Sequence, residues 1–90
     1  VFNRWLARIR DRQAAKAIAQ RLDRLVAGNL GDVKPVGDGV SEMRIFAGSG
    51  YRLYFTMRDG ELIILLCGGN KSSQSRDIAC AKRILSELEA

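Results

Sequence analysis

The sequence of 90 residues predicts a small α+β domain, with a helical hairpin first, a three-stranded antiparallel meander next and a helix at the end. Three observations support this prediction. Apolar residues recur at helical spacing in the first third of the chain, alternate in the middle third, and return to helical spacing in the last third. A chain of this length holds one hydrophobic core, since dividing it leaves too little surface to bury. We therefore expect a single domain over residues 1–90.

Two amphipathic helices are expected in the first third, joined as an αα-hairpin. The first has an apolar stripe formed by Phe2, Trp5, Leu6 and Ile9. The second has one formed by Ala14, Ala15, Ile18, Leu22, Leu25 and Val26. Asp11-Arg12-Gln13 is expected to be the hinge between them. Gly28-Asn29 should end the second helix, because both residues tolerate the left-handed backbone found at helix C-termini.

The middle of the chain predicts the sheet. Leu30–Gly39 is expected to be a loop, since it is rich in Gly and Asp and contains the single proline, Pro35. Three strands are expected after this loop. In the first, Met43 and Ile45 alternate with Glu42 and Arg44. The second is Tyr51–Arg58 and the third is Glu61–Cys67. The third is apolar on both faces, so we expect it to be the most buried strand.

The turns and the final helix complete the prediction. Ala47-Gly48-Ser49-Gly50 and Asp59-Gly60 are the expected turns, the second being a two-residue hairpin signal. A helix over Ser73–Glu89 should present the apolar stripe Ile78, Ala81, Leu85 and Leu88. A three-stranded meander cannot stand alone, so we expect the helices to cover its apolar face.

Charge and composition narrow the class of partner. The chain carries 15 Lys+Arg against 10 Asp+Glu, a formal charge of +5, which suits an acidic partner such as nucleic acid, an anionic membrane or an acidic protein. An ordinary basic surface is the alternative. No apolar run approaches the roughly 20 residues that span a bilayer. Arg4, Arg8 and Arg10 interrupt any apolar segment of a signal peptide, so we expect a cytoplasmic protein. Cys67 and Cys80 are expected to be buried free thiols.

Several chemistries are excluded by what the chain lacks. It has no histidine, which excludes histidine-dependent catalytic triads and paired-imidazole ribonuclease chemistry. No carboxylates are spaced for a metal, so we expect no metal site and no cofactor. Gly68-Gly69-Asn70-Lys71-Ser72 fails the phosphate-loop pattern, because Asn70 precedes Lys71 where that pattern has glycine.

The alternation predicts a polar patch on the sheet. If Leu53 and Phe55 face the core, Arg52 and Tyr54 lie on the opposite face with Glu42 and Arg44 of the neighbouring strand. Arginine forks bind phosphate bidentately, and a tyrosine ring can stack on an unpaired base. The alternative is that Arg44 pairs with Glu42 or Asp32 as an exposed ion pair.

A second polar feature precedes the final helix. Lys71 stands just before a helix N-terminus, where backbone N–H groups and the hydroxyls of Ser72 and Ser73 could bind an anion. The alternative is ordinary capping, with Ser72 or Ser73 as N-cap, Asp77 near the first turn and Lys71 in solvent.

Three stretches resemble a known family. They are residues 28–34 (GNLGDVK), residues 40–45 and 48–55 (VSEMRI, GSGYRLYF), and residues 65–74 (LLCGGNKSSQ) with Arg76-Asp77-Ile78 and Ala81 following. Together they resemble the HigB-like "addiction module killer" branch of the RelE/ParE toxin superfamily over almost the whole chain. The family's RelE-like fold adds a first strand before the helical hairpin, which we expect to be clipped or missing here.

The resemblance implies a function. Such toxins of type II toxin–antitoxin systems act as metal-independent endoribonucleases (mRNA interferases) that cut messenger RNA in the ribosome and inhibit translation. It implies that Arg52 clamps the phosphate, that Arg44 assists from the preceding strand, and that Lys71 stabilises or protonates the leaving oxygen. Asp77 takes roughly the place of the aromatic acid often found in the final segment of RelE, which makes it the fourth expected catalytic residue. Tyr54, Ser72 and Ser73 are the expected RNA-binding residues.

The resemblance also implies partners and leaves two alternatives. The expected partners are a cognate antitoxin with a helix-turn-helix domain, the ribosome and its messenger RNA, and operator DNA through the antitoxin complex. No membrane is expected. ParE-like members share the fold but inhibit DNA gyrase without cutting RNA, and a degenerate toxin would only bind its antitoxin as a corepressor. Fold does not choose among these, because function depends on the site.

Overall fold

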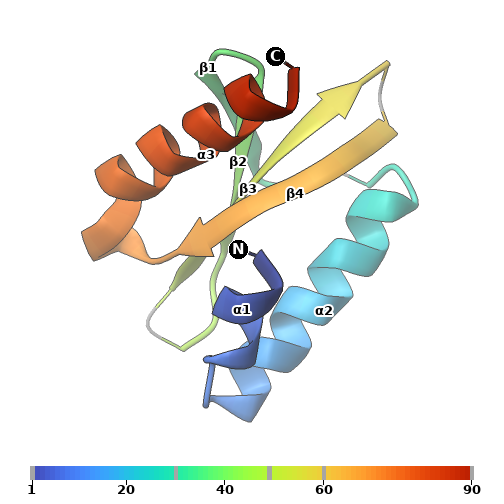
Figure 1. The fold of residues 1–90 in the computed structure, drawn as a ribbon. Helices are drawn as coiled ribbons and strands as arrows, with labels where there is room; N and C mark the ends of the chain where they lie inside the picture. Colours follow the sequence, from blue (N-terminus) through green and yellow to red (C-terminus); the bar gives the residue numbers. More distant parts are fainter. Residues whose placement is uncertain (1, 30, 49, 60, 90) are drawn as a thin grey trace.

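The computed structural model describes residues 2–29, 31–48, 50–59 and 61–89, without the side chains of residues 2 and 61–63. Within these residues the helices and strands follow each other as predicted, with one strand added (Figure 1). The elements are α1 (Phe2–Ala7), α2 (Arg12–Val26), β1 (Val33–Gly37), β2 (Val40–Ile45), β3 (Tyr51–Arg58), β4 (Glu61–Gly69), the 3-10 turn η1 (Lys71–Ser73) and α3 (Gln74–Glu89).

Both helices of the first third are present and their ends have local causes. The carboxylate of Asp11 accepts hydrogen bonds from the backbone N–H groups of Gln13 and Ala14, at 3.0 and 3.2 Å. Asp11 is therefore the N-cap of α2, because it satisfies donors that the first turn leaves unpaired. At the other end the helix stops at Val26, and Gly28 follows with φ +92°, as the glycine signal predicts.

The expected loop over Leu30–Gly39 is wrong for most of its length, because Val33–Gly37 forms strand β1. It pairs antiparallel with β2, from Val33 opposite Met43 to Gly37 opposite Val40. Asp38 and Gly39 connect them with φ +53° and +81°, and positive φ at both positions is the requirement of a tight two-residue hairpin turn. Pro35 is tolerated, since an edge strand can spare a backbone N–H.

The sheet order is β1-β2-β3-β4, with every pair antiparallel. The structure does not support the expectation that Glu61–Cys67 is the most buried strand, because β4 lies at an edge and Ile64 is 36% exposed; the side chains of residues 61–63 lie outside the described part. The interior strands hold most of the fully buried residues, namely Val40, Glu42 and Met43 of β2 and Leu53, Tyr54 and Phe55 of β3. The apolar character of β4 has another cause: helices contact it from both faces, α1 and α2 on one and α3 on the other.

One face of the sheet packs against α1 and α2 and forms an apolar core. Its fully buried members are Ile18 and Leu25 of α2, Met43 and Ile45 of β2, and Leu53 and Phe55 of β3. Trp5, Leu6 and Ile9 pack at its margin. The alternation of β2 and β3 predicts this face correctly.

The opposite face is covered by α3, which corrects the expectation that all helices cover one face (Figure 1). Its buried apolar residues are Val40, Tyr54, Leu66, Cys67, Ala81 and Leu85. A register shift between Tyr54 and Phe55 places Leu66 as an extra residue of β4 beside Cys67. Leu88, predicted in the stripe, is 58% exposed, so the stripe ends at Leu85.

Two further expectations concern cysteines and membranes. Cys67 and Cys80 are both free, as predicted. Cys67 is buried and Cys80 is partly exposed on α3. Among the described helices none has the length and apolar character needed to cross a membrane.

Candidate functional site: a basic pocket over a buried carboxylate

Three basic side chains from separate elements line one pocket of about 260 Å³. Arg44 lies near the end of β2, Arg52 near the start of β3, and Lys71 in η1. Strand pairing explains the convergence, because Arg44 is the partner of Arg52 and Arg52 is the partner of Gly69, two residues before Lys71. Phe46 and Tyr51 also line the pocket. Three of the four predicted catalytic residues therefore meet at one end of the sheet.

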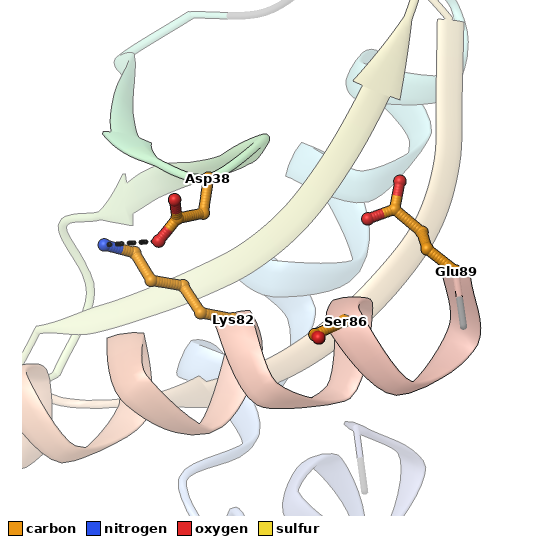
Figure 2. Close-up of a pocket in the computed structure, with 4 residues that line it drawn as sticks. All are labelled: Asp38, Lys82, Ser86 and Glu89. Atoms are coloured by element: carbon orange, nitrogen blue, oxygen red, sulfur yellow. Dashed lines mark ion pairs between the residues drawn. The ribbon is translucent and has the colours of Figure 1, made fainter.

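A larger groove lies at the opposite end of α3 and is a poorer candidate. It has a volume of about 550 Å³ and is lined by Asp38, Lys82, Ser86 and Glu89 (Figure 2). The Lys82 ammonium lies 3.6 Å from the Asp38 carboxylate, so its charge is already balanced. None of the predicted site residues lines this groove.

Beneath the basic pocket, Glu42 is completely buried. Its Oε2 accepts hydrogen bonds from the Tyr54 hydroxyl and the Gln74 side-chain amide, both at 2.9 Å. Arg52 Nε lies 3.7 Å from the same oxygen, and Lys34 Nζ lies 3.8 Å from Oε1. Burial, and then the hydrogen bond to Glu42, raise the pKa of Tyr54 well above its ordinary value, so the phenol stays a donor.

The predicted role of Tyr54 as a base-stacking residue is not compatible with its position. Its ring is on the face that alternation predicts, but α3 covers that face and leaves Tyr54 0% exposed. Arg52, also expected at the surface, has a side chain only 14% exposed. Alternation gives the side of a sheet on which a residue lies, and it does not show what packs there.

The exposed aromatic residue at the pocket is Phe46, which sequence reasoning missed. It is 78% exposed, and the Arg44 guanidinium lies 5.6 Å from its ring centroid. Phe46 follows the last residue of β2 and so falls outside the alternating pattern. The sequence did contain a signal for this position, because Phe46 is a large apolar residue between the predicted strand and the predicted turn.

Arg44 makes the ion pair that the alternative interpretation foresaw. Its guanidinium lies 3.2 Å from an oxygen of Asp32, and both side chains are 42% exposed. Solvent-exposed pairs of this kind contribute at most about 1 kcal/mol. A phosphate can therefore compete with Asp32 for Arg44.

The segment before α3 is capped by Asn70, where we expected Ser72 or Ser73. The Asn70 side-chain oxygen accepts hydrogen bonds from the Ser72 hydroxyl at 2.6 Å and from the Ser73 backbone N–H at 3.2 Å. The Asn70 backbone N–H donates in return to the Ser73 hydroxyl oxygen at 3.2 Å, which completes a capping box. Lys71 remains exposed.

Asp77 does not line the pocket with the three basic residues. Its carboxylate accepts a short hydrogen bond from the Ser73 hydroxyl, and its backbone oxygen accepts one from the Cys67 thiol at 3.3 Å. Asp77, Ser72, Ser73 and Tyr54 are not lining residues of the basic pocket. In the described parts of the chain, no group of three acidic, Cys or His side chains is placed to hold a metal ion.

Comparisons with known proteins agree with a toxin-like assignment. Residues 4–86 match the family described as "Phage derived protein Gp49-like (DUF891)". An uncharacterised protein of Haemophilus influenzae is 47% identical over 87 residues, which are 97% of this chain and 88% of that protein. No solved structure gives a significant match. The chain belongs to the Gp49-like family of phage-derived proteins, which is commonly associated with RelE-like toxins of toxin–antitoxin systems.

Proposed function

We propose that this protein is the toxin of a type II toxin–antitoxin system, with a RelE-like fold of the HigB-like branch, and that it cuts messenger RNA in the translating ribosome. The observation that carries this proposal is the convergence of Arg44, Arg52 and Lys71 on one pocket. Family membership supports a toxin, and the net charge of +5 suits an RNA substrate.

The proposed reaction needs charge stabilisation and alignment. The 2′-hydroxyl of one nucleotide attacks the adjacent phosphorus, the bond to the 5′-oxygen of the next nucleotide breaks, and a 2′,3′-cyclic phosphate and a 5′-hydroxyl result. Negative charge grows on the non-bridging oxygens during the attack. Arg52 and Arg44 carry planar donor forks that bind such oxygens, and Lys71 neutralises or protonates the departing 5′-oxygen.

The exposed ring of Phe46 supplies the base contact that Tyr54 cannot make. Stacking of an unpaired base on an aromatic ring contributes about 1–3 kcal/mol and tolerates any base. Phe46 lies beside Arg44 at the rim of the pocket, so a stacked base would bring its own phosphate towards the cations. Ser72 and Ser73, which are next to Lys71, remain proposed RNA contacts.

The decisive test is primer extension on messenger RNA from cells induced to make the protein, with gyrase supercoiling measured in parallel. We expect cuts inside translated frames that disappear when ribosomes are absent. Intact transcripts together with inhibited gyrase would contradict the proposal and favour the ParE-like alternative. Intact transcripts with normal gyrase and a retained antitoxin complex would favour a corepressor.

The proposed protein partner is a cognate antitoxin with a helix-turn-helix domain, through which the complex binds operator DNA. An acidic amphipathic helix suits a basic pocket rimmed by an exposed aromatic residue. Co-expression with the adjacent small reading frame should restore growth and co-purify a complex. The absence of a binding protein in either neighbouring frame would count against the toxin proposal.

A further inference from the structure

Glu42 is the most costly polar residue in the described core. It is 0% exposed, in the middle of the face that α3 covers. Removing a carboxylate from water costs several kcal/mol, and an apolar residue of similar size often serves stability as well or better. Fold stability alone therefore gives a poor account of Glu42, and its neighbours indicate another role.

The contacts of Glu42 divide into two kinds. Two neutral donors, the Tyr54 hydroxyl and the Gln74 amide, make hydrogen bonds of 2.9 Å to Oε2 and fix the carboxylate from β3 and α3. Two cations stand further away, with Arg52 Nε at 3.7 Å and Lys34 Nζ at 3.8 Å. Within the described residues, neither Arg52 Nε nor Glu42 Oε1 has a hydrogen-bond partner. The neutral donors hold Glu42, and Glu42 acts on Arg52 through charge.

This arrangement restrains the Arg52 guanidinium beside the pocket. Its Nε is buried and faces Glu42, while the same side chain lines the pocket with Arg44 and Lys71. A guanidinium is planar and rigid, so an Nε held beside Glu42 also restricts the plane in which the two outer nitrogens lie. Those two nitrogens carry the parallel N–H groups that match two oxygens of a phosphate.

We infer that Glu42 is a positioning residue, which, held by Tyr54 and Gln74, orients Arg52 so that its outer N–H groups bind a phosphate in the pocket. The inference rests on the proposed function for the identity of that phosphate as the scissile one of messenger RNA. Glu42 itself touches no substrate, because it is completely buried. Loss of such an outer partner typically costs about 10–100-fold in affinity or activity at metal sites, and we expect a similar loss here.

The first experiment does not depend on RNA cleavage. The N–H resonance of Arg52 Nε is followed by NMR while inorganic phosphate is added to the wild-type protein and to Glu42→Gln, which keeps the shape of the side chain. We expect phosphate to shift this resonance, with an affinity about tenfold lower in Glu42→Gln. Equal phosphate affinity and an unchanged Arg52 resonance in a folded Glu42→Gln protein would overturn the inference.

The second experiment separates positioning from a structural role. Glu42→Gln is combined with Arg52→Lys, and RNA cleavage and urea denaturation are measured for the wild-type protein, the two single variants and the double variant. If Glu42 acts through Arg52, its substitution lowers kcat in the wild-type background and causes no further loss in the Arg52→Lys background. The same loss of kcat in both backgrounds would contradict the inference, since it would indicate a general structural effect.

Two more variants keep the test interpretable. Gln74→Ala removes one hydrogen bond to Glu42 and leaves the charge of Glu42 in place. It replaces Glu42→Gln in the test if Glu42→Gln does not fold, and its loss of phosphate affinity should be smaller than the loss of about tenfold expected for Glu42→Gln. Asp38→Asn is the matched control, because it removes the ion pair with Lys82 of α3, outside the basic pocket, and should leave phosphate affinity unchanged (Figure 2). Glu42-dependent phosphate binding without RNA cleavage would uphold the positioning inference and reject the proposed function.

Discussion

The two faces of the sheet bury different kinds of side chain. The face against α1 and α2 buries apolar side chains, among them Met43, Leu53 and Phe55. The face against α3 buries Glu42 and most of Arg52 beside apolar neighbours. An apolar core accepts many side chains of suitable volume, whereas a buried polar group requires particular partners. The comparison predicts that substitutions on the first face mainly alter stability and those on the second also alter activity.

The largest effect is expected in the apolar core. Phe55→Ala should lower the free energy of unfolding by about 3–5 kcal/mol, because it removes a large ring and leaves a cavity. Urea denaturation measures this directly. Val26→Ala is the control, since Val26 is 72% exposed and should change stability by less than about 0.5 kcal/mol. A loss below about 1 kcal/mol for Phe55→Ala would show that this face is not a tightly packed core.

The next largest effect concerns the polar face. Arg52→Lys keeps the positive charge beside Glu42 but loses the planar donor fork, so RNA cleavage should fall by about 10²-fold or more. The free energy of unfolding should change far less than in Phe55→Ala. Primer extension and urea denaturation on the same preparation give both values. Wild-type cleavage by Arg52→Lys would remove the bidentate clamp from the mechanism.

Substitutions at two adjacent glycines of β4, Gly68 and Gly69, test the two faces of the sheet within one strand. A Cβ at Gly68 would lie 2.5 Å from the Trp5 ring on the α1 side, while a Cβ at Gly69 would collide with Asp77 and Ser73 on the α3 side. Gly68→Ala should cost about 1–3 kcal/mol of stability by overpacking and leave the folded protein active. Gly69→Ala should also reduce cleavage, because it displaces the segment that carries Lys71. Equal activity of the two folded variants would break the distinction between the faces.

The most gradual effect is a dependence of stability on alkaline pH. Burial, and then the neighbouring Cys80, raise the pKa of the Cys67 thiol from 9.0 to about 12. Between these values the unfolded state has released a proton that the folded state keeps, so stability falls as pH rises, by up to about 1.4 kcal/mol per pH unit. The raised pKa of Tyr54 adds a loss of the same sign above its ordinary value of 10.0.

The matching experiment is urea denaturation from about pH 8 to about pH 11 under reducing conditions. Below pH 9.0 the contribution of Cys67 should be complete and the free energy of unfolding constant with respect to this group. Cys67→Ala should show a shallower fall than the wild-type protein. Identical slopes would mean that the thiol ionises equally easily in the folded and unfolded states.

The sequence predicted the parts of the fold that local pattern determines. The helices, the strands β2 and β3 and the Gly28 helix end follow from periodicity and turn chemistry. Strand β1 was missed because Pro35 and the glycines around it indicate a loop, although Asp38-Gly39 is the same kind of hairpin signal that was recognised at Asp59-Gly60. Gly60 itself lies outside the described residues. The loop prediction followed the Gly and Pro content of the segment, although the Asp38-Gly39 pair is the more specific indicator of a hairpin.

The sequence allowed the basic residues of the site to be predicted, but it did not allow their spatial arrangement or their burial to be predicted. Arg44, Arg52 and Lys71 come together in one pocket because strand register brings them there. Tyr54 could not be predicted as buried, since nothing in β3 shows that α3 packs on its polar side. The packing of a helix is a long-range property, and the pairing of Glu42 with Gln74 spans 32 residues. Such contacts follow from the fold and cannot be read from strand periodicity.

The sheet order also sets the sequence of events in folding. Because β1, β2, β3 and β4 pair in chain order, each pairing closes a short loop, and topologies with such local contacts fold quickly. Arg44 and Arg52 lie opposite each other in one such local pairing, β2 with β3. Lys71 and Gln74 lie in η1 and α3, which follow the sheet in the chain and are synthesised after it. During synthesis, the basic pocket can therefore be completed only after all four strands have been made.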